Sequence, residues 1–153
     1  MAKFHLSLTV NGEQREVLID PRRSLLDVLR DELDLRGAHR GCDSGDCGAC
    51  TVLLEGKPIT ACMTLAADCD GMDVLTVEGI TPPGGMHPVQ KALVEQGGIQ
   101  CGFCTPGMVM AAIALLNDNP HPTAHDVREG LAGNLCRCTG YKKIVEAVLA
   151  VRD

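Results

Sequence analysis

The cysteines constrain the fold of this chain more than any other feature of its sequence. Eight of the nine cysteines fall into two groups of four, called here the first and the second quartet. The first is Cys42-x4-Cys47-x2-Cys50 completed by Cys62, and the second is Cys101-x2-Cys104 completed by Cys136-x-Cys138. Each quartet has the spacing of an iron–sulfur site. We therefore expect a fold whose loops close round two metal centres.

The first quartet is the more specific of the two. Its first three cysteines reproduce the C-x4-C-x2-C run that holds a [2Fe–2S] cluster in plant-type ferredoxins. Gly41, Gly45 and Gly48 stand among them. Glycines let the backbone wrap closely round an anionic cluster and aim N–H groups at its sulfurs. The alternative is a zinc ribbon or a glycine-rich loop, but zinc sites usually use C-x2–4-C pairs. The pattern favours [2Fe–2S].

The spacing of the second quartet is compatible with either an iron–sulfur cluster or a zinc ion. Four thiolates at these spacings also suit a tetrahedral zinc ion. The sequence predicts that Cys104 and Cys138 each directly precede a helix. A helix N-terminus carries partial positive charge and free N–H groups, which favour an anionic cluster. A Cys-x-Cys pair is also unusual for zinc knuckles. With the first quartet as context, iron is favoured and zinc stays the alternative.

Two clusters on one chain indicate electron transfer, because two centres in series pass an electron between two other sites. The ninth cysteine, Cys69, lies outside both quartets and is interpreted as a free structural thiol. The formal net charge is −6. Each oxidised four-thiolate [2Fe–2S] centre adds about −2 to that charge. Nucleic acid is therefore excluded as a partner, since binding it requires a basic face.

No targeting or membrane segment is apparent in the sequence. No stretch approaches the ~20 apolar residues that span a bilayer, and no apolar signal region follows Met1. We expect a cytoplasmic protein without membrane insertion. In that compartment closely spaced cysteines are more often metal ligands than disulfides.

Residues 1–80 have the pattern of a β-rich unit with one helix. Asn11-Gly12 is a strong hairpin signal. Ser24 to Asp27 form a capping box that begins a helix running to about Leu33. The predicted strands cover 4–10, 14–19, 51–54, 57–60 and 72–78.

A proline- and glycine-rich segment, 81–86, is predicted to link this unit to a helical domain over 87–153. Thr105 is predicted as the N-cap of one of its helices, with Pro106 at the first helical position. The predicted helices cover 87–96, the segment from Thr105, the segment after Thr123 and 141–151.

Three motifs support a resemblance to a known family. They are GCDSGDCGAC at 41–50, QCGFCTPG at 100–107 and GNLCRCTGY at 133–141. Together, in this order, they resemble the small iron–sulfur subunit of the molybdenum hydroxylases, the family of xanthine dehydrogenase, aldehyde oxidase and carbon monoxide dehydrogenase. The resemblance covers nearly the whole chain. It implies an α+β fold, with an N-terminal plant-type ferredoxin-like β-grasp domain followed by a C-terminal four-helix bundle.

The resemblance also implies an order for the two clusters, while the direction of electron flow stays open because the family includes a reductive branch. In the oxidative direction the order is as follows. The second quartet would hold the cluster nearest the molybdopterin–molybdenum cofactor and receive the electron first. The first quartet would pass the electron on toward FAD. Gln100 matches a family glutamine that hydrogen-bonds the pterin, and its amide offers the donors and acceptor for this. The alternative for Gln100 is an ordinary loop residue.

The remaining parts of such an enzyme are expected on other subunits. This sequence has no G-x-G-x-x-G dinucleotide motif and no room for a molybdenum-binding domain, so we assign it no catalytic side chain. The resemblance implies a large molybdenum-binding subunit, a medium FAD-binding subunit and a dimer of heterotrimers. The alternative function is a freestanding two-cluster ferredoxin. A third hypothesis is a zinc-stabilised interaction module.

Overall fold

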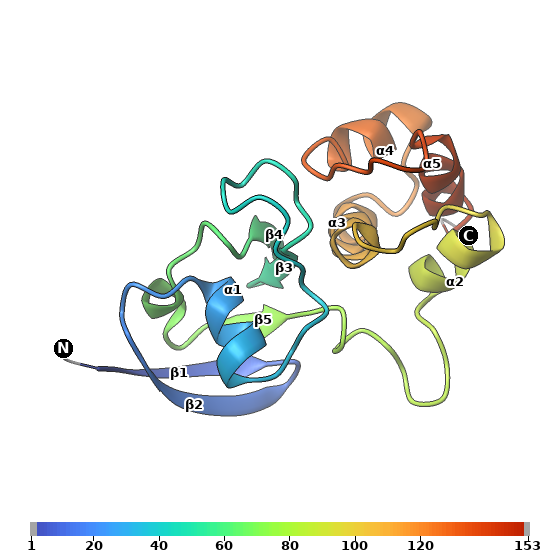
Figure 1. Cartoon of the computed structure of the whole chain (residues 1–153). Helices are drawn as coiled ribbons and strands as arrows, with labels where there is room; N and C mark the ends of the chain where they lie inside the picture. The colour runs from blue at the N-terminus through green and yellow to red at the C-terminus, as the bar shows by residue number, and fades with distance from the viewer. Residues whose placement is uncertain (1–2, 152–153) are drawn as a thin grey trace.

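The computed structural model describes residues 3–151. A five-stranded sheet with a short helix forms one side of the molecule, and helices α2 to α5 form the other (Figure 1). The strands are β1 (Phe4–Val10), β2 (Glu13–Ile19), β3 (Thr51–Leu54), β4 (Lys57–Thr60) and β5 (Asp73–Leu75).

The sheet has the strand order β2-β1-β5-β3-β4. β1 and β2 pair antiparallel, as do β3 and β4, so both predicted hairpins are confirmed. β5 pairs parallel to β1 and antiparallel to β3, which joins the two hairpins into one mixed sheet. Such a sheet with a helix packed against it is the predicted β-grasp arrangement.

The last strand is shorter than predicted, because β5 ends at Leu75 rather than continuing to 78. Asn11 takes the place of a strand partner. Its Oδ1 accepts a hydrogen bond from the Thr76 backbone N–H at 2.8 Å, and its Nδ2 donates to Thr76 Oγ1 at 3.0 Å. The Gly79 N–H then donates back to the Thr76 carbonyl at 3.0 Å. Side-chain bonds of this kind compete with the strand ladder.

The helix of the N-terminal part begins at the predicted capping box. Ser24 Oγ accepts from the Asp27 N–H, and Asp27 Oδ2 accepts from the Ser24 N–H, each at 3.1 Å. α1 (Leu25–Asp27) continues into a π-helical turn, η1 (Val28–Glu32). The Leu33 N–H closes this turn on the Val28 carbonyl at 3.1 Å, which confirms the predicted end. The apolar side chains of the helix share one core with β1 and β3.

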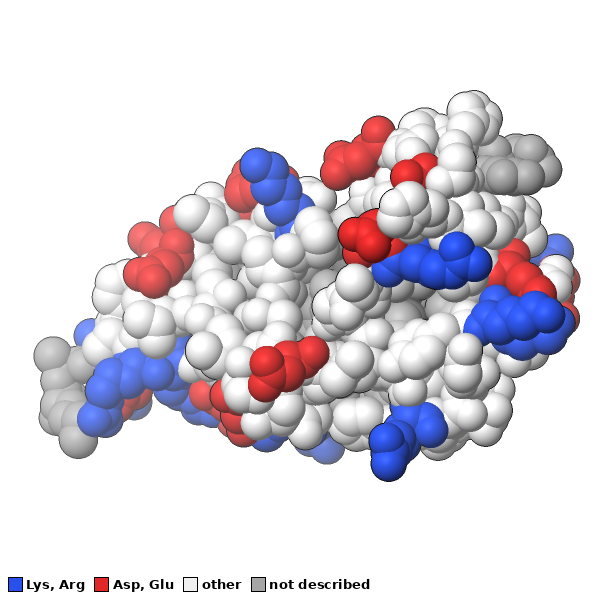
Figure 2. All heavy atoms as spheres, turned by 90° about the horizontal axis from the view of Figure 1, so that it is seen from above, with Lys and Arg blue, Asp and Glu red and all other residues white. Residues whose placement is uncertain are grey.

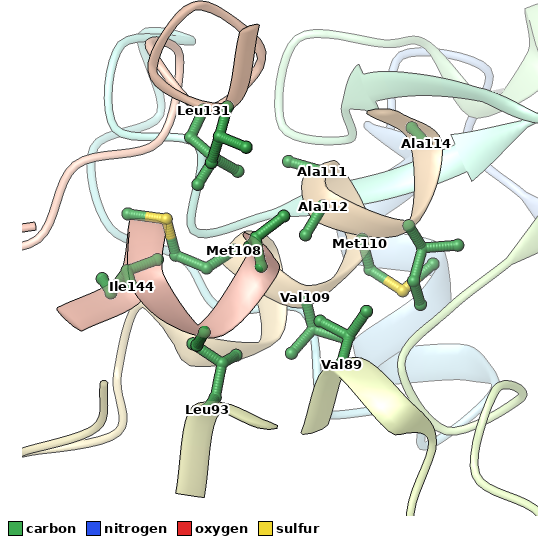
Figure 3. Close-up of a cluster of buried hydrophobic side chains, with 14 of the residues drawn as sticks. Val89, Leu93, Met108, Val109, Met110, Ala111, Ala112, Ala114, Leu131 and Ile144 are labelled. Carbon is green, nitrogen blue, oxygen red and sulfur yellow. The ribbon is translucent and has the colours of Figure 1, made fainter. Parts of the chain in front are cut away.

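The four predicted C-terminal helices are present and form the predicted bundle. They are α2 (Pro88–Glu95), α3 (Thr105–Asp118), α4 (Ala124–Gly130) and α5 (Lys142–Leu149). α3 lies at the centre, between Val89 and Leu93 of α2, Ile144 of α5 and Leu131 after α4 (Figure 3). It is buried without interruption over 107–114, as expected of a central helix. Leu53 of β3 belongs to the same core, so the sheet covers part of α3.

Two predicted helix starts are wrong. The N-cap of α3 is Cys104 rather than Thr105, because the Thr105 N–H already closes a turn on the Gly102 carbonyl at 3.2 Å. Cys138 does not directly precede a helix, since Tyr141, with a φ of 67°, is the N-cap of α5. Of these two cysteines, Cys104 alone therefore lies at the partially positive start of a helix.

The division into 1–80, the linker 81–86 and 87–153 stays a prediction. Val77 and Ile80 pack against the helical core. No helix within 3–151 is long and apolar enough to cross a membrane. On the face shown in Figure 2, Lys and Arg lie in separate groups among Asp and Glu, and no continuous basic surface forms there.

His87 is expected to make α2 less stable in mild acid. His87 is the N-cap, and its Nδ1 accepts from the Val89 N–H at 3.3 Å. Burial lowers its pKa below the ordinary value of 6.5. The unfolded chain therefore binds a proton before the folded chain does, and stability falls as pH drops through 6.5.

His87→Asn keeps a good N-cap without a titratable group. We expect the midpoint temperature of thermal unfolding to fall less for this variant than for the parent chain when the pH is lowered from about 7.5 to about 5.5. An equal loss in both would contradict this role of His87.

Candidate metal centres

The first quartet lies where the loop after η1 returns to the sheet. Cys42, Cys47 and Cys50 precede β3, and Cys62 follows β4. The backbone N–H groups of Ser44 and Cys47 both donate to Cys42 Sγ at 3.5 Å. Backbone N–H groups gathered in this way form an anion-binding concavity.

Glycines keep the space round these sulfurs free of side chains. A Cβ at Gly41 would lie 2.7 Å from Cys47 Sγ. Gly45 and Gly48 have φ angles of 81° and 67°, in the left-handed region that favours glycine. The loop thus combines a cradle that side chains would fill with a set of four thiols, and both suit a [2Fe–2S] cluster.

The four thiols of the first quartet influence one another. Hydrogen bonds from Ser44 and Cys47 lower the pKa of Cys42 to about 6. Burial, followed by the neighbouring Cys50, raises the pKa of Cys62 to about 11. Burial also raises the pKa of Cys47, with Cys42 and Cys62 adding to the effect. The structure therefore brings together all four residues, although sequence separates them by up to twenty positions.

The second quartet is gathered at the start of α3 and in the segment before α5. Cys101 Sγ and Cys138 Sγ lie 3.6 Å apart. Cys136 Sγ accepts from the Thr139 N–H at 3.4 Å and from Thr139 Oγ1 at 3.1 Å. Burial raises the pKa of Cys104 to about 12, and Cys136 adds to this rise. Burial opposes ionisation of Cys136 as well, but the bonds from Thr139 outweigh it and lower its pKa to about 7.

All nine cysteines are free thiols. Within 3–151, no three His, Cys, Asp or Glu side chains surround a point closely enough to hold a single metal ion. The fit to a cluster rests on the two sets of four thiols and on the glycine cradle. Cys69 is separate from both quartets, since it is fully buried in the N-terminal core. Gln100 is exposed directly before Cys101.

The sequence did not reveal the contacts that join the two quartets. The Leu135 N–H donates to the Cys47 carbonyl at 2.9 Å, so the segment before Cys136 is bonded to the first ligand loop. His39 and Phe103 make a second contact. Their rings stack with centroids 4.8 Å apart, and His39 Nδ1 lies 2.7 Å from the Phe103 carbonyl. No spacing rule identifies such pairs, because 64 residues separate His39 from Phe103.

Comparison with known families agrees with this arrangement. A model of the 2Fe-2S iron-sulfur cluster binding domain matches residues 8–73. A model of a second [2Fe-2S] binding domain matches residues 76–149. Fold and ligand groups together define an iron–sulfur protein with two [2Fe–2S] clusters. The second match favours iron over zinc in the part of the chain that contains the second quartet.

Similar proteins narrow the family further. The chain is 45% identical over 148 residues to the nicotinate dehydrogenase small FeS subunit of Eubacterium barkeri, covering 97% of this chain and 94% of that one. It is similar to a chain of quinoline 2-oxidoreductase from Pseudomonas putida 86, with a TM-score of 0.96, 40% identity and coverage of 99% and 95%. It also matches 17% of the aldehyde oxidoreductase chain of Desulfovibrio gigas, over 97% of its own length, with a TM-score of 0.93 and 44% identity.

The chain belongs to the small [2Fe–2S] subunits of the molybdenum hydroxylase family. Its relatives are iron–sulfur subunits of dehydrogenases and oxidoreductases, and it is a subunit of such an enzyme. In this family the molybdenum cofactor and FAD are typically carried by the partner subunits.

Proposed function

We propose that this chain relays single electrons between a molybdopterin site and FAD through its two [2Fe–2S] clusters. The cluster ligands in this proposal are Cys42, Cys47, Cys50 and Cys62 for the first cluster, and Cys101, Cys104, Cys136 and Cys138 for the second. The observation that carries the relay is the hydrogen bond of 2.9 Å from the Leu135 N–H to the Cys47 carbonyl. It connects Leu135, which directly precedes the proposed ligand Cys136 of the second cluster, to Cys47, a proposed ligand of the first cluster.

The second cluster receives the electron from molybdenum in this proposal, and the first cluster passes it on to FAD. Gln100 would contact the pterin, which its exposure beside Cys101 allows. The chain's own residues contribute binding, orientation and shielding. When bound, the clusters supply one-electron redox chemistry.

We further propose a large molybdenum-binding subunit and a medium FAD-binding subunit as partners, in a dimer of heterotrimers in the cytoplasm. Exposed apolar side chains near Gln100 support a permanent partner. Met86 and Val94 are about half exposed, at 53% and 54%. They line an apolar groove of about 380 Å³ that extends to Gly102 and Pro106. An apolar groove beside a ligand loop suits a lasting interface better than a transient one.

Gentle purification of the tagged chain from its own host, with metal counts, tests the proposal. We expect about four irons and about one molybdenum per chain, with two larger chains that co-purify. About four irons without molybdenum or a stable partner would favour the alternative, a freestanding two-cluster ferredoxin.

Gln100→Ala tests the proposed pterin contact. We expect turnover of the assembled enzyme to fall about tenfold, since groups that orient a cofactor have effects of this size. Iron and molybdenum counts should not change. Gln96→Ala is the matched control, because Gln96 is an exposed glutamine at the C-cap of α2. Equal turnover in both variants would make Gln100 an ordinary loop residue.

A further inference from the structure

A small buried polar network joins the two ligand loops. Three polar or charged side chains are buried within 3–151, and two of them, Thr51 and Asn134, contact each other. Asn134 Nδ2 donates to Thr51 Oγ1 at 3.1 Å and to the Gly48 carbonyl at 2.9 Å. Thr51 Oγ1 donates to the same carbonyl at 2.7 Å. A buried amide with satisfied donors holds its neighbours in one arrangement.

This network lies between the proposed ligands of the two clusters. Gly48 directly follows Cys47, and Thr51 directly follows Cys50. On the other side, Asn134 is two residues before Cys136. The Asn134 side-chain bonds therefore stand beside the Leu135 backbone bond to Cys47, and together they attach one ligand loop to the other.

The backbones of these loops approach each other closely. A Cβ at Gly48 would lie 2.3 Å from the Gly133 carbonyl oxygen. A Cβ at Gly107, three residues after Cys104, would lie 2.2 Å from the Gly48 carbonyl oxygen. Gly48 thus touches both segments that carry the second quartet. The Asn134 amide bonds to its carbonyl at the centre of this contact.

We propose that Asn134 is a positioning residue that fixes the separation and orientation of the two clusters. The inference rests on the proposed function, because it needs both quartets to hold clusters. Without the amide, the Gly48 carbonyl keeps its bonds from the N–H and the hydroxyl of Thr51, which belong to its own loop. Of the hydrogen bonds described between the two ligand loops, the one from the Leu135 N–H to the Cys47 carbonyl then remains. Electron tunnelling depends steeply on the distance between centres, so a looser junction slows transfer between the clusters.

The test is electron paramagnetic resonance of the purified complex reduced with dithionite. Two reduced clusters at a fixed distance interact magnetically and split or broaden each other's signals. In Asn134→Ala we expect this splitting to be lost or smeared, with iron per chain unchanged. Transfer between the clusters should fall about tenfold, as for other residues that orient metal ligands.

Two further variants keep the test decisive if Asn134→Ala folds poorly. Thr51→Val removes one partner of the amide and leaves the Gly48 bond, so we expect a smaller change of the same kind. Thr76→Val is the matched control, because it removes a buried hydroxyl whose Asn11 contact lies within the N-terminal part. It should lower stability and leave the splitting unchanged.

The possible failures are distinguishable. If Asn134→Ala and Thr51→Val both showed the same splitting as the parent protein and only a lower unfolding temperature, the positioning role would be overturned. A parent complex without two distinct [2Fe–2S] signals would instead overturn the proposed function on which the role depends.

Discussion

Replacement of Gly48 by alanine is expected to destabilise the chain by on the order of 3 kcal/mol, the sum of left-handed backbone strain and overpacking. The Gly48 φ is 67°, and its added Cβ would lie 2.3 Å from the Gly133 carbonyl oxygen. A backbone atom cannot rotate away as a flexible side chain does. The first ligand loop must then separate from the segment before Cys136. Thermal unfolding of the iron-loaded chain, with iron counts, measures the loss.

Two glycine controls separate the causes of this effect. Gly12 has a φ of 81° but nothing within 4 Å of an added Cβ, so Gly12→Ala should show backbone strain alone. We expect a cost of about 1 kcal/mol there. Gly133→Ala has neither problem and should be nearly neutral. If Gly48→Ala were as stable as Gly12→Ala, the contact between the two loops would leave room for a Cβ, and overpacking at Gly48 would be contradicted.

Serine replacements of single proposed ligands are expected to separate the two clusters. Cys104→Ser should impair the cluster nearer molybdenum. Cys47→Ser should spare that cluster and block onward transfer to FAD. Either loss should lower turnover with a flavin-linked acceptor by at least about 100-fold, the upper range for residues that merely support metal ligands. Electron paramagnetic resonance of the reduced complex identifies which signal has gone.

Cys69→Ser provides the matched control for both replacements. Cys69 is fully buried, its Sγ lies 3.6 Å from the Leu65 carbonyl, and it belongs to neither quartet. We expect its replacement to keep both signals and the iron content, at some cost in stability. If Cys47→Ser removed only the signal of the cluster nearer molybdenum, the proposed order of the relay would be reversed.

Local patterns predicted most of the secondary structure. The Asn11-Gly12 turn and the Ser24 capping box involve neighbours in sequence, and both form as expected. The early end of β5 involves a distant group. Asn11 ends β5 by bonding to Thr76, 65 residues away. Alternation of apolar residues carries no information about such a partner.

The same distinction applies to the candidate site. Cysteine spacing indicated the two quartets, because ligands of one cluster follow a family pattern. The contacts of Asn134 with Gly48 span 86 residues and depend on how the sheet and the helices meet. The close contact of Gly107 could not be predicted from the sequence either, because it is made with the Gly48 carbonyl in another part of the fold. Packing between elements, rather than propensity within them, decides these positions.

The hydrogen bond from Leu135 to Cys47 has a consequence for how the cofactors are acquired. We expect binding of one cluster to order its own loop and, through this bond, part of the other loop, so that the second cluster meets a lower entropic cost. Thermodynamic linkage requires the benefit to be equal in both directions. Loading should then be cooperative. Native mass spectrometry of partly loaded protein would show empty and fully loaded chains at the expense of those with a single cluster.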